Sequence, residues 1–440
     1  MANQEMKICA EEALNGNLED CARLLFPQEG ETMPKLRFSG FEGEWERKLL
    51  SECLEISEEK NTDNKFGIED VLSVSDDYGV VNQIELLGRS YAGKSVSGYK
   101  ILRPGQIVYT KSPLKAKPYG IVKQNTGEAG IVSVLYAVYN TKEGVAPEYI
   151  HYYFDPAWRL NAYMRPLVNK GAKNTMNISD ETALTGYIMI PKDIEEQRRI
   201  ATYLRSLDEQ IAIQQQQLER LKKMKQSCLG LLFADNQSIT PPLRFKGFSG
   251  EWKRVKLVEI ANKFNYGINA AAKPYDGYNK YLRITDIDED MRVFNKDNLT
   301  SPEANNVEAY LLQEGDIVLA RTGASVGKSY FYDANDGRVV FAGFLIRVQL
   351  KDTVCPRFIF TCTQTENYYK YIRMVSQRSG QPGVNTREYG DYSFLIPPTI
   401  EEQRCIANFF ERLDKRIVLQ SQQVEKLKQV KKACLNQFIA

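Results

Sequence analysis

The chain repeats itself, and the two copies lie about 206 residues apart. Residues 36–45, LRFSGFEGEW, return at 243–252 as LRFKGFSGEW, with eight of ten positions identical. Residues 194–211, IEEQRRIATYLRSLDEQI, return at 400–417 as IEEQRCIANFFERLDKRI. A repeat of this length is far longer than the roughly 20–50 residues of a solenoid unit. The sequence therefore predicts a duplicated domain with an internal pseudo-two-fold repeat.

Each copy consists of a mixed part followed by a long helical part. The mixed parts contain short β-branched and aromatic runs, such as 105–110 and 315–320, separated by Gly and Pro. Asp193 and Thr399 are expected as the N-caps of the two long helices. We predict an α+β fold with a leader at 1–35, a mixed domain at 36–192, a helix at 193–236, a linker at 237–242, a second mixed domain at 243–398 and a second helix at 399–440. A short helix is expected over Glu11–Leu25 of the leader.

Both helical parts carry a heptad pattern of apolar residues, sustained over more than four heptads, which is typical of a coiled coil. Gln214 and Lys225 interrupt the first stripe, and Gln420 and Lys431 interrupt the second at matching positions. Polar layers of this kind fix the register of a coiled coil. The alternative is an ordinary amphipathic helix packed on its own domain. The predicted seam consists of Ile200, Leu204, Leu207, Ile211, Leu218, Leu221, Ile406, Phe410, Leu413, Ile417, Val424 and Leu427.

Charge is balanced overall but uneven along the chain. The 440 residues contain 58 Lys and Arg and 56 Asp and Glu, a net charge of +2, which excludes a histone-like polycation. Residues 1–88 carry a net charge of −12 and residues 89–192 a net charge of +8. The second stretch is therefore the expected position of a polyanion.

Few residues in the sequence suit catalysis or metal binding. His151 is the only histidine, and the eight cysteines are scattered without a C-x-x-C pair, which disfavours zinc sites and histidine acid–base chemistry. We expect His151 to pack among aromatic residues. No apolar run approaches the roughly 18 residues of a membrane span, and no secretory signal is evident. A cytoplasmic protein with reduced cysteines is predicted.

The string RTGASVGKSY at 321–330 is the most distinctive loop. It misses the phosphate-binding P-loop spacing, because only three residues separate Gly323 from Gly327, and strand-like sequence follows where that motif needs a helix. What remains is a glycine-rich loop with Arg321 and Lys328 at its ends, which suits a DNA phosphate or base edge. The alternative is a glycine hairpin with solvated basic residues.

Three further loops are basic. YTKSPLKAKPYG at 109–120 occupies the matching place in the first copy and carries three lysines. NKGAKNTMN at 169–177 and QRSGQPGVN at 377–385 each contain glycine and end in asparagine. Arg and Lys commonly pair with guanine, and Asn with adenine, in the major groove of DNA. Simple surface turns are the alternative interpretation.

The repeated LRF-x-GF-x-GEW motif, the EEQR-x-I motif and the Leu-Asp pair in each helix resemble the specificity subunit of a type I restriction–modification enzyme. The resemblance covers nearly the whole chain from residue 34. It implies two target-recognition domains, each reading half of a split DNA sequence, held apart by two helices that form an antiparallel coiled coil. It also implies a non-catalytic chain that binds double-stranded DNA, two methyltransferase (modification) subunits and restriction/translocase subunits. S-adenosylmethionine, ATP and Mg are expected in those partners, with no cofactor or metal in this chain and no membrane contact.

The resemblance also assigns the glycine-bearing loops to DNA. In the first domain the correspondence is looser, since the 109–120 loop departs from the RTG pattern. The expected DNA-binding residues are Lys111, Lys115, Lys117, Lys170, Lys173 and Asn177 in the first domain, and Arg321, Thr322, Gly323, Lys328, Arg378, Gln381 and Asn385 in the second.

Two other classes of protein remain open from the residues alone. A coiled-coil scaffold or adaptor that binds only protein partners would suit the near-zero net charge. An enzyme with an unrecognised carboxylate site is disfavoured by the absence of catalytic motifs, and the acidic run DIDED at 286–290 is typical of a solvated loop.

Overall fold

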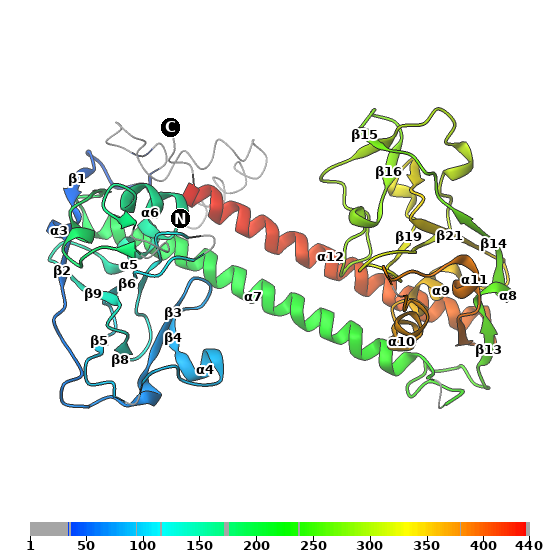
Figure 1. Cartoon of the computed structure of the whole chain (residues 1–440), viewed down its shortest axis with the longest axis horizontal. Helices are drawn as coiled ribbons and strands as arrows, with labels where there is room; N and C mark the ends of the chain where they lie inside the picture. The colour runs from blue at the N-terminus through cyan, green and yellow to red at the C-terminus, as the bar shows by residue number, and fades with distance from the viewer. Residues whose placement is uncertain are drawn as a thin grey trace. The chain divides into compact units, whose positions relative to one another are not determined.

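The fold was analysed in a computed structural model of the chain (Figure 1). The structure describes residues 34, 37–93, 95–114, 117–170, 176–235, 238–378 and 380–436. The helix expected over Glu11–Leu25 lies outside these residues. The chain divides into two compact units, unit 1 (Met1–Ile213 and Val424–Ala440) and unit 2 (Gln214–Gln423). Each unit thus combines one mixed part with segments of both long helices, and the expected domain boundaries stay a prediction.

Unit 1 is built on an antiparallel sheet with the strand order β2-β9-β6-β7. These strands are β2 (Leu54–Ile56), β9 (Tyr136–Thr141), β6 (Ile107–Thr110) and β7 (Val122–Gln124). A separate pair, β1 (Glu46–Leu49) with β12 (Tyr187–Ile190), ties the beginning of the mixed part to its end. The remaining elements are α3 (Leu50–Cys53), β3 (Leu72–Ser75), β4 (Gly79–Asn82), α4 (Gln83–Leu87), β5 (Lys100–Leu102), β8 (Gly130–Val132), α5 (Pro147–Phe154), α6 (Ala157–Met164), β10 (Asn169–Lys170), β11 (Met176–Asn177) and 3₁₀ turns at Ile68–Asp70 and Thr182–Leu184.

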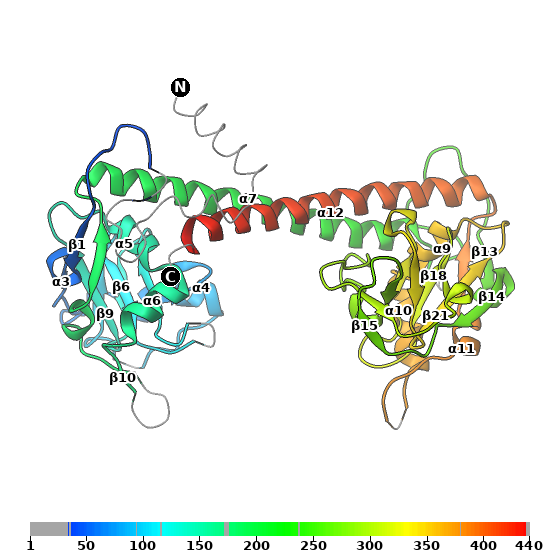
Figure 2. The ribbon, with the colours of Figure 1, turned by 90° about the horizontal axis from the view of Figure 1, so that it is seen from above.

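The core of unit 1 lies between this sheet and its helices. Figure 2 shows α5 and α6 beside strands β6 and β9. Helix α5 begins with Pro147, whose fixed φ suits the first turn, and it buries Tyr149 and Ile150 in the core. Leu204 and Leu435 from the two long helices join the same cluster, so both helices are part of this core.

Unit 2 repeats the plan. Its sheet has the strand order β14-β21-β18-β19, built from β14 (Ala261–Tyr266), β21 (Leu345–Leu350), β18 (Ile317–Ala320) and β19 (Ser329–Phe331). Strands β13 (Lys253–Lys256) and β22 (Ser393–Ile396) pair as β1 and β12 do. The remaining elements are α8 (Leu257–Ile260), β15 (Ala272–Pro274), β16 (Lys280–Leu282), β17 (Thr300–Pro302), β20 (Val339–Phe341), α9 (Pro356–Cys362), α10 (Glu366–Val375), α11 (Thr386–Gly390) and 3₁₀ turns at Ile284–Asp286, Glu308–Tyr310 and Ala334–Asp336.

The two long helices are α7 (Ile194–Leu232) and α12 (Ile400–Asn436). The Asp193 carboxylate accepts a hydrogen bond from the Glu195 N–H (2.8 Å), and the Thr399 hydroxyl accepts one from the Glu402 N–H (3.3 Å), as expected for N-caps. These caps, together with two glutamates in each first turn, explain why both helices begin where they do.

The helices run antiparallel within each unit. In unit 2, Gln420 donates a hydrogen bond to the Gln214 side chain, and Lys225 forms an ion pair with Asp414 (2.7 Å). In unit 1, Lys431 forms an ion pair with Asp208 (2.7 Å). All twelve residues of the predicted seam are buried or half-buried. The predicted fold class, mixed α+β domains with an antiparallel helix pair, is confirmed.

The two lysine layers do not face each other. Each lysine instead meets the aspartate of the Leu-Asp pair on the opposite helix, Lys431 with Asp208 and Lys225 with Asp414. Lys225 and Lys431 are 206 residues apart in the sequence, and so are Asp208 and Asp414, so the two contacts are pseudo-symmetric copies. The Leu-Asp pair that repeats in the sequence therefore supplies one partner of a register-fixing ion pair in each unit.

Among the described residues, no helix is both long and apolar enough to cross a membrane.

Candidate nucleic-acid interface

The repeated motifs form structural joints. In unit 1, the Arg37 guanidinium binds Glu196 through two hydrogen bonds of 2.7 Å, and the Trp45 ring N–H donates to the same carboxylate (3.2 Å). In unit 2, Arg244 binds Glu402 with the same distances. Glu196 is only 1% exposed and Arg37 is half-buried, so this bidentate pair is largely shielded from solvent. The motifs LRF-x-GF-x-GEW and EEQR therefore tie the segment before each mixed part to the first turn of each long helix.

The glutamine of each EEQR motif makes a second joint. The Gln197 side chain accepts a hydrogen bond from the Ala146 N–H (2.9 Å) and donates to the Pro191 carbonyl (2.9 Å). In unit 2, the Gln403 side chain accepts from the Cys355 N–H (2.9 Å). Ala146 has no side chain that could cap helix α5. The glutamine therefore satisfies an N-terminal amide of that helix and fixes α5 to α7.

The two glycine-bearing loops of unit 2 come together. Thr322 and Gly383 form an antiparallel bridge, and the Gly323 N–H donates to the Pro382 carbonyl (3.0 Å). The Val384 N–H donates to the Arg321 carbonyl (2.9 Å). In Figure 2 the chain between α10 and α11 extends from the body of unit 2 as an orange loop. Two segments that the sequence predicted separately thus lie side by side and form a surface that we call the unit 2 loop surface (residues 321–327, 376–378 and 380–386).

Arg321 is the central cation of the unit 2 loop surface. It follows β18 directly, and its guanidinium carbon lies 4.6 Å from the ring centroid of Tyr266. Among the described residues none forms an ion pair with Arg321, and its Nε is buried without a hydrogen-bond partner. The Thr386 N–H donates to the Tyr266 hydroxyl (3.4 Å), which links this ring to the second loop. Stacking on an aromatic ring orients a guanidinium group while leaving its charge available to an anion.

Gly323 and Gln381 lie on the same surface. Gly323 has a φ of +76°, and a Cβ atom there would meet the Gln381 amide nitrogen at 3.1 Å. Glycine is therefore favoured by the backbone conformation, and a Cβ atom there would also displace the Gln381 side chain slightly. Gln381 itself is exposed, and Thr322 is half-buried beside Gly383. The structure thus brings together Arg321, Thr322, Gly323 and Gln381.

Two other predicted residues of unit 2 have structural partners. The Asn385 side chain accepts a hydrogen bond from the Glu388 N–H (2.9 Å), and the Glu388 carboxylate accepts from the Asn385 N–H (2.9 Å). This capping box begins α11 and occupies the amide oxygen of Asn385. Arg378 pairs with the same Glu388 and donates to the Val375 carbonyl (2.7 Å). Both residues shape the second loop.

Lys328 does not join the loop surface. It is only 6% exposed, its ammonium group donates to the Ile287 carbonyl (3.1 Å), and it pairs with Glu289. Ile287 and Glu289 both belong to the acidic run at 286–290, and Glu289 neutralises the charge of Lys328. The expectation that Lys328 contacts DNA has no support in this geometry, because the side chain turns inward at the start of β19.

The loop lysines of unit 1 are also paired internally. Lys111 forms an ion pair with Asp180, which also binds Lys100 (2.5 Å). Lys117 is buried, pairs with Asp76 (2.6 Å) and donates to the Asp155 carbonyl (2.8 Å). The sequence suggested a basic loop available to DNA, but in the structure Lys111 and Lys117 both form internal ion pairs. Lys170 and Asn177 lie in β10 and β11, but their side chains, like residues Lys115 and Lys173, fall outside what the structure describes.

Asp155 is the hub of an ionic cluster in unit 1 that the sequence did not reveal. Its carboxylate binds Lys123 (2.8 Å) and Lys431 (3.1 Å). Burial by itself would raise the pKa of Asp155, but the charges of Lys123 and Lys431 outweigh burial and hold that pKa well below its usual range. The Lys431 ammonium therefore connects α12 both to Asp208 of α7 and to the end of α5. This cluster could not be predicted from the sequence, because Lys431 is 276 residues from Asp155.

His151 lies beside this cluster on α5. Its ring centroid is 4.7 Å from that of Tyr152, in line with the expected aromatic surroundings. Burial lowers the pKa of His151 to about 3, and the neighbouring positive charge of Lys123 acts in the same direction. The Nδ1 atom is buried without a hydrogen-bond partner among the described residues. His151 is therefore half-buried, and its lowered pKa favours the neutral imidazole at pH 7.

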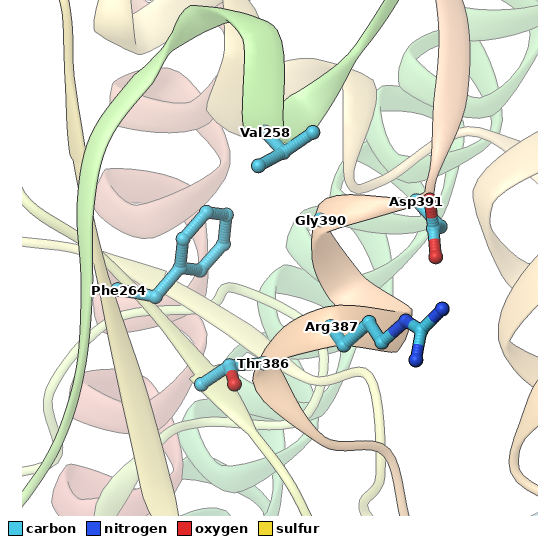
Figure 3. A pocket seen from close by; sticks show the side chains of 6 residues that line it. All are labelled: Val258, Phe264, Thr386, Arg387, Gly390 and Asp391. Carbon is cyan, nitrogen blue, oxygen red and sulfur yellow. The ribbon is translucent and has the colours of Figure 1, made fainter.

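An open pocket lies next to the unit 2 loop surface (Figure 3). Its apolar side chains, Val258 and Phe264, come from the region of α8 and β14, and its polar ones come from α11. Asp391 in its wall pairs with Lys256 (2.9 Å). Thr386 belongs both to this pocket and to the loop surface. Within the described part of the chain, no group of three His, Cys, Asp or Glu side chains is placed to hold a metal ion.

Comparisons with known proteins agree with the repeated plan. The family described as "Type I restriction modification DNA specificity domain" matches residues 42–223 and 249–429. The MjaVIII type I restriction enzyme specificity subunit of Methanocaldococcus jannaschii is 23% identical over 255 residues. That match covers 55% of this chain and 59% of the relative, so the chain spans about three-fifths of the relative's length.

A solved structure shares the fold. The crystal structure of a type I restriction–modification S subunit from M. genitalium has a TM-score of 0.57, at 13% identity, and the match covers 92% of this chain and 98% of that one. A chain from a structure of type I restriction–modification complex assembly has a TM-score of 0.48 at 16% identity, with 89% and 96% covered. The family match covers both copies of the repeat, so the chain belongs to the type I restriction–modification DNA specificity domain family.

Proposed function

We propose that this chain is the DNA-binding specificity subunit of a type I restriction–modification complex and that it has no catalytic activity of its own. Family membership supports recognition of a DNA target. The observation that carries the proposal is the unit 2 loop surface. There an arginine without an ion-pair partner among the described residues is oriented by Tyr266 between two glycine-bearing loops. Arginine in such a setting suits guanine or phosphate recognition.

We further propose that the target is split into two parts. The matched frames of units 1 and 2 support this, because their central sheets have equivalent strand orders and a basic loop follows the equivalent strand in each, β6 in unit 1 and β18 in unit 2. The loops differ in sequence, so each unit would read a different short sequence. Phosphate contacts position a protein on DNA, whereas base contacts specify the sequence, so each unit needs only a few reading residues.

The partners in this proposal are double-stranded DNA, two methyltransferase subunits and restriction/translocase subunits, with the assembly acting in the cytoplasm. S-adenosylmethionine, ATP and Mg would belong to those partners. The frames of the two units, each with an Arg–Glu joint whose carboxylate is buried, would hold the loops in place while the loop sequences vary.

Selection from a random duplex pool tests the function. The full chain, alone and co-expressed with methyltransferase subunits, is incubated with random duplexes, and the bound DNA is sequenced. We expect two conserved blocks separated by a spacer without preference, and an affinity that falls with salt. An adaptor that binds only proteins would retain no duplex above background, and a single uninterrupted block would contradict the split target.

A further inference from the structure

The turn between β20 and β21 in unit 2 exposes an aromatic residue beside Arg321. Phe344 is 61% exposed. Its carbonyl accepts a hydrogen bond from the Arg321 N–H (3.0 Å), so the two residues lie opposite each other where the central strands β18 and β21 end. The turn therefore borders the unit 2 loop surface, although no sequence motif pointed to it.

The same position in unit 1 also exposes a large apolar residue. Strands β6 and β9 pair Thr110 with Tyr136, and strands β18 and β21 pair Ala320 with Leu345. One step beyond each pair, the register places Lys111 opposite Leu135, as it places Arg321 opposite Phe344. Leu135 is 64% exposed. Each unit thus presents a cation on one strand end and an exposed apolar side chain on the other.

Packing inside the units does not account for this repetition. Single exposed apolar residues are common and need no explanation. Here, however, exposure recurs at one register position in two units whose loops otherwise differ. The next residue along each strand faces the fold instead, since Leu345 is buried and Tyr136 is half-buried. The exposed position is therefore available to a ligand that approaches the loop side of the sheet.

We propose that Phe344 in unit 2 and Leu135 in unit 1 are sequence-reading residues that pack against the C5-methyl group of thymine in the major groove. This inference rests on the proposed DNA-binding function. Apolar side chains recognise the thymine methyl group, while an adjacent arginine favours guanine. Because Arg321 and Phe344 are held opposite each other by a backbone hydrogen bond, they would contact neighbouring bases.

The two units would use this position differently. Arg321 is stacked on Tyr266 and has no ion-pair partner among the described residues, so unit 2 offers both a cation and an apolar contact. Lys111 is bound by Asp180, so its charge is largely neutralised. The apolar contact of Leu135 would therefore carry a larger share of recognition in unit 1.

The test compares Phe344→Ala with a matched control in the same unit. Tyr278→Ala removes an aromatic side chain that is 64% exposed and stacks with Arg338 at 4.8 Å, outside the loop surface. Duplexes bound by each full-length variant are selected and sequenced. We expect Phe344→Ala to lose one thymine preference in one half of the target and about tenfold in affinity for the wild-type sequence. Tyr278→Ala should keep both, and Leu135→Ala should lose a thymine in the other half.

Uracil provides a second readout, because it lacks only the methyl group. Replacing the selected thymine by uracil should weaken wild-type binding as much as Phe344→Ala does, and should leave Phe344→Ala binding unchanged. If Phe344→Ala and wild type select the same sequence with the same affinity, while Arg321→Ala still loses a base preference, the thymine contact is overturned and the DNA-binding function stands. If wild type retains no duplex, the proposed function fails and the inference fails with it.

Discussion

Units 1 and 2 share one frame but use their cations differently. The sheet order, the joined end strands and the Arg–Glu joint recur in both. In unit 1, however, Lys111 and Lys117 form internal ion pairs, whereas Arg321 of unit 2 stacks on an aromatic ring. Part of the basic charge of residues 89–192 therefore lies in ion pairs that stabilise unit 1. A count of basic residues therefore overestimates the charge that a polyanion would meet.

The largest expected effect tests what the units share. Glu196→Ala and Glu402→Ala each leave a half-buried arginine without its carboxylate, which should lower the free energy of unfolding by about 2–4 kcal/mol. The loss of unfolding free energy should be at least as large for Glu196→Ala as for Glu402→Ala, because the Trp45 ring N–H also loses its hydrogen-bond acceptor. Urea unfolding of both variants measures this. A loss below about 1 kcal/mol in either variant would show that the joint is not structural.

The lysine layers should distinguish the units. Lys431 meets two carboxylates, Asp208 and Asp155, whereas Lys225 meets Asp414 and the amide of Gln364. Lys431→Met should therefore destabilise the protein by about 2–4 kcal/mol, and Lys225→Met by about 1–2 kcal/mol. Thermal and urea unfolding measure both. The reverse order would contradict the role given to Asp155.

DNA binding should depend on the cations unequally. Arg321→Ala should cost about 1–3 kcal/mol of binding free energy and relax specificity at a single base position. Lys111→Ala should cost less, because Asp180 already neutralises that charge. Titration of the selected duplex at two salt concentrations measures both. A uniform loss across sequences for Arg321→Ala, with a shallower salt dependence, would assign Arg321 to phosphate contact.

The smallest effect concerns pH and unit 1 alone. Burial lowers the pKa of His151 to about 3, below the ordinary value of about 6.5 in an unfolded chain. Between these values the unfolded chain binds more protons, so the stabilisation that a neutral His151 provides is lost as pH falls from about 6.5 towards 3. The slope should approach about 1.4 kcal/mol per pH unit.

Unit 2 supplies the matched control for this prediction. Helices α5 and α9 align from Pro147 and Pro356, which places Phe360 at the position of His151. His151→Phe should therefore flatten the acid side of the stability curve relative to the wild type. Unfolding free energies at pH 7, 6 and 5 measure the difference. Identical curves for the wild type and His151→Phe would contradict the lowered pKa of His151.

The duplicated plan, the two long helices and their seam were predictable, because the repeat and the heptads can be read directly from the order of residues in the sequence. Which basic residues face outward was not, because that depends on ion pairs such as Lys117–Asp76 and Lys328–Glu289, whose partners lie about 40 residues away. The Asn385 side chain caps α11, a structural role that the sequence analysis did not predict. The Asn-x-x-Glu spacing to Glu388 is a capping-box pattern and could have identified it.

The central claim is that each unit reads one part of a split target, and exchanging loops tests it most directly. Residues 321–327 and 377–385 of unit 2 would be replaced together by the corresponding loops of another family member, with the frame left intact. The loops must be exchanged as a pair, because Thr322 and Gly383 join them. Sequencing of the bound duplexes should show one block changed, with the other block and the spacer as before. Both blocks changing together, or neither changing in a folded protein that still binds DNA, would contradict the account.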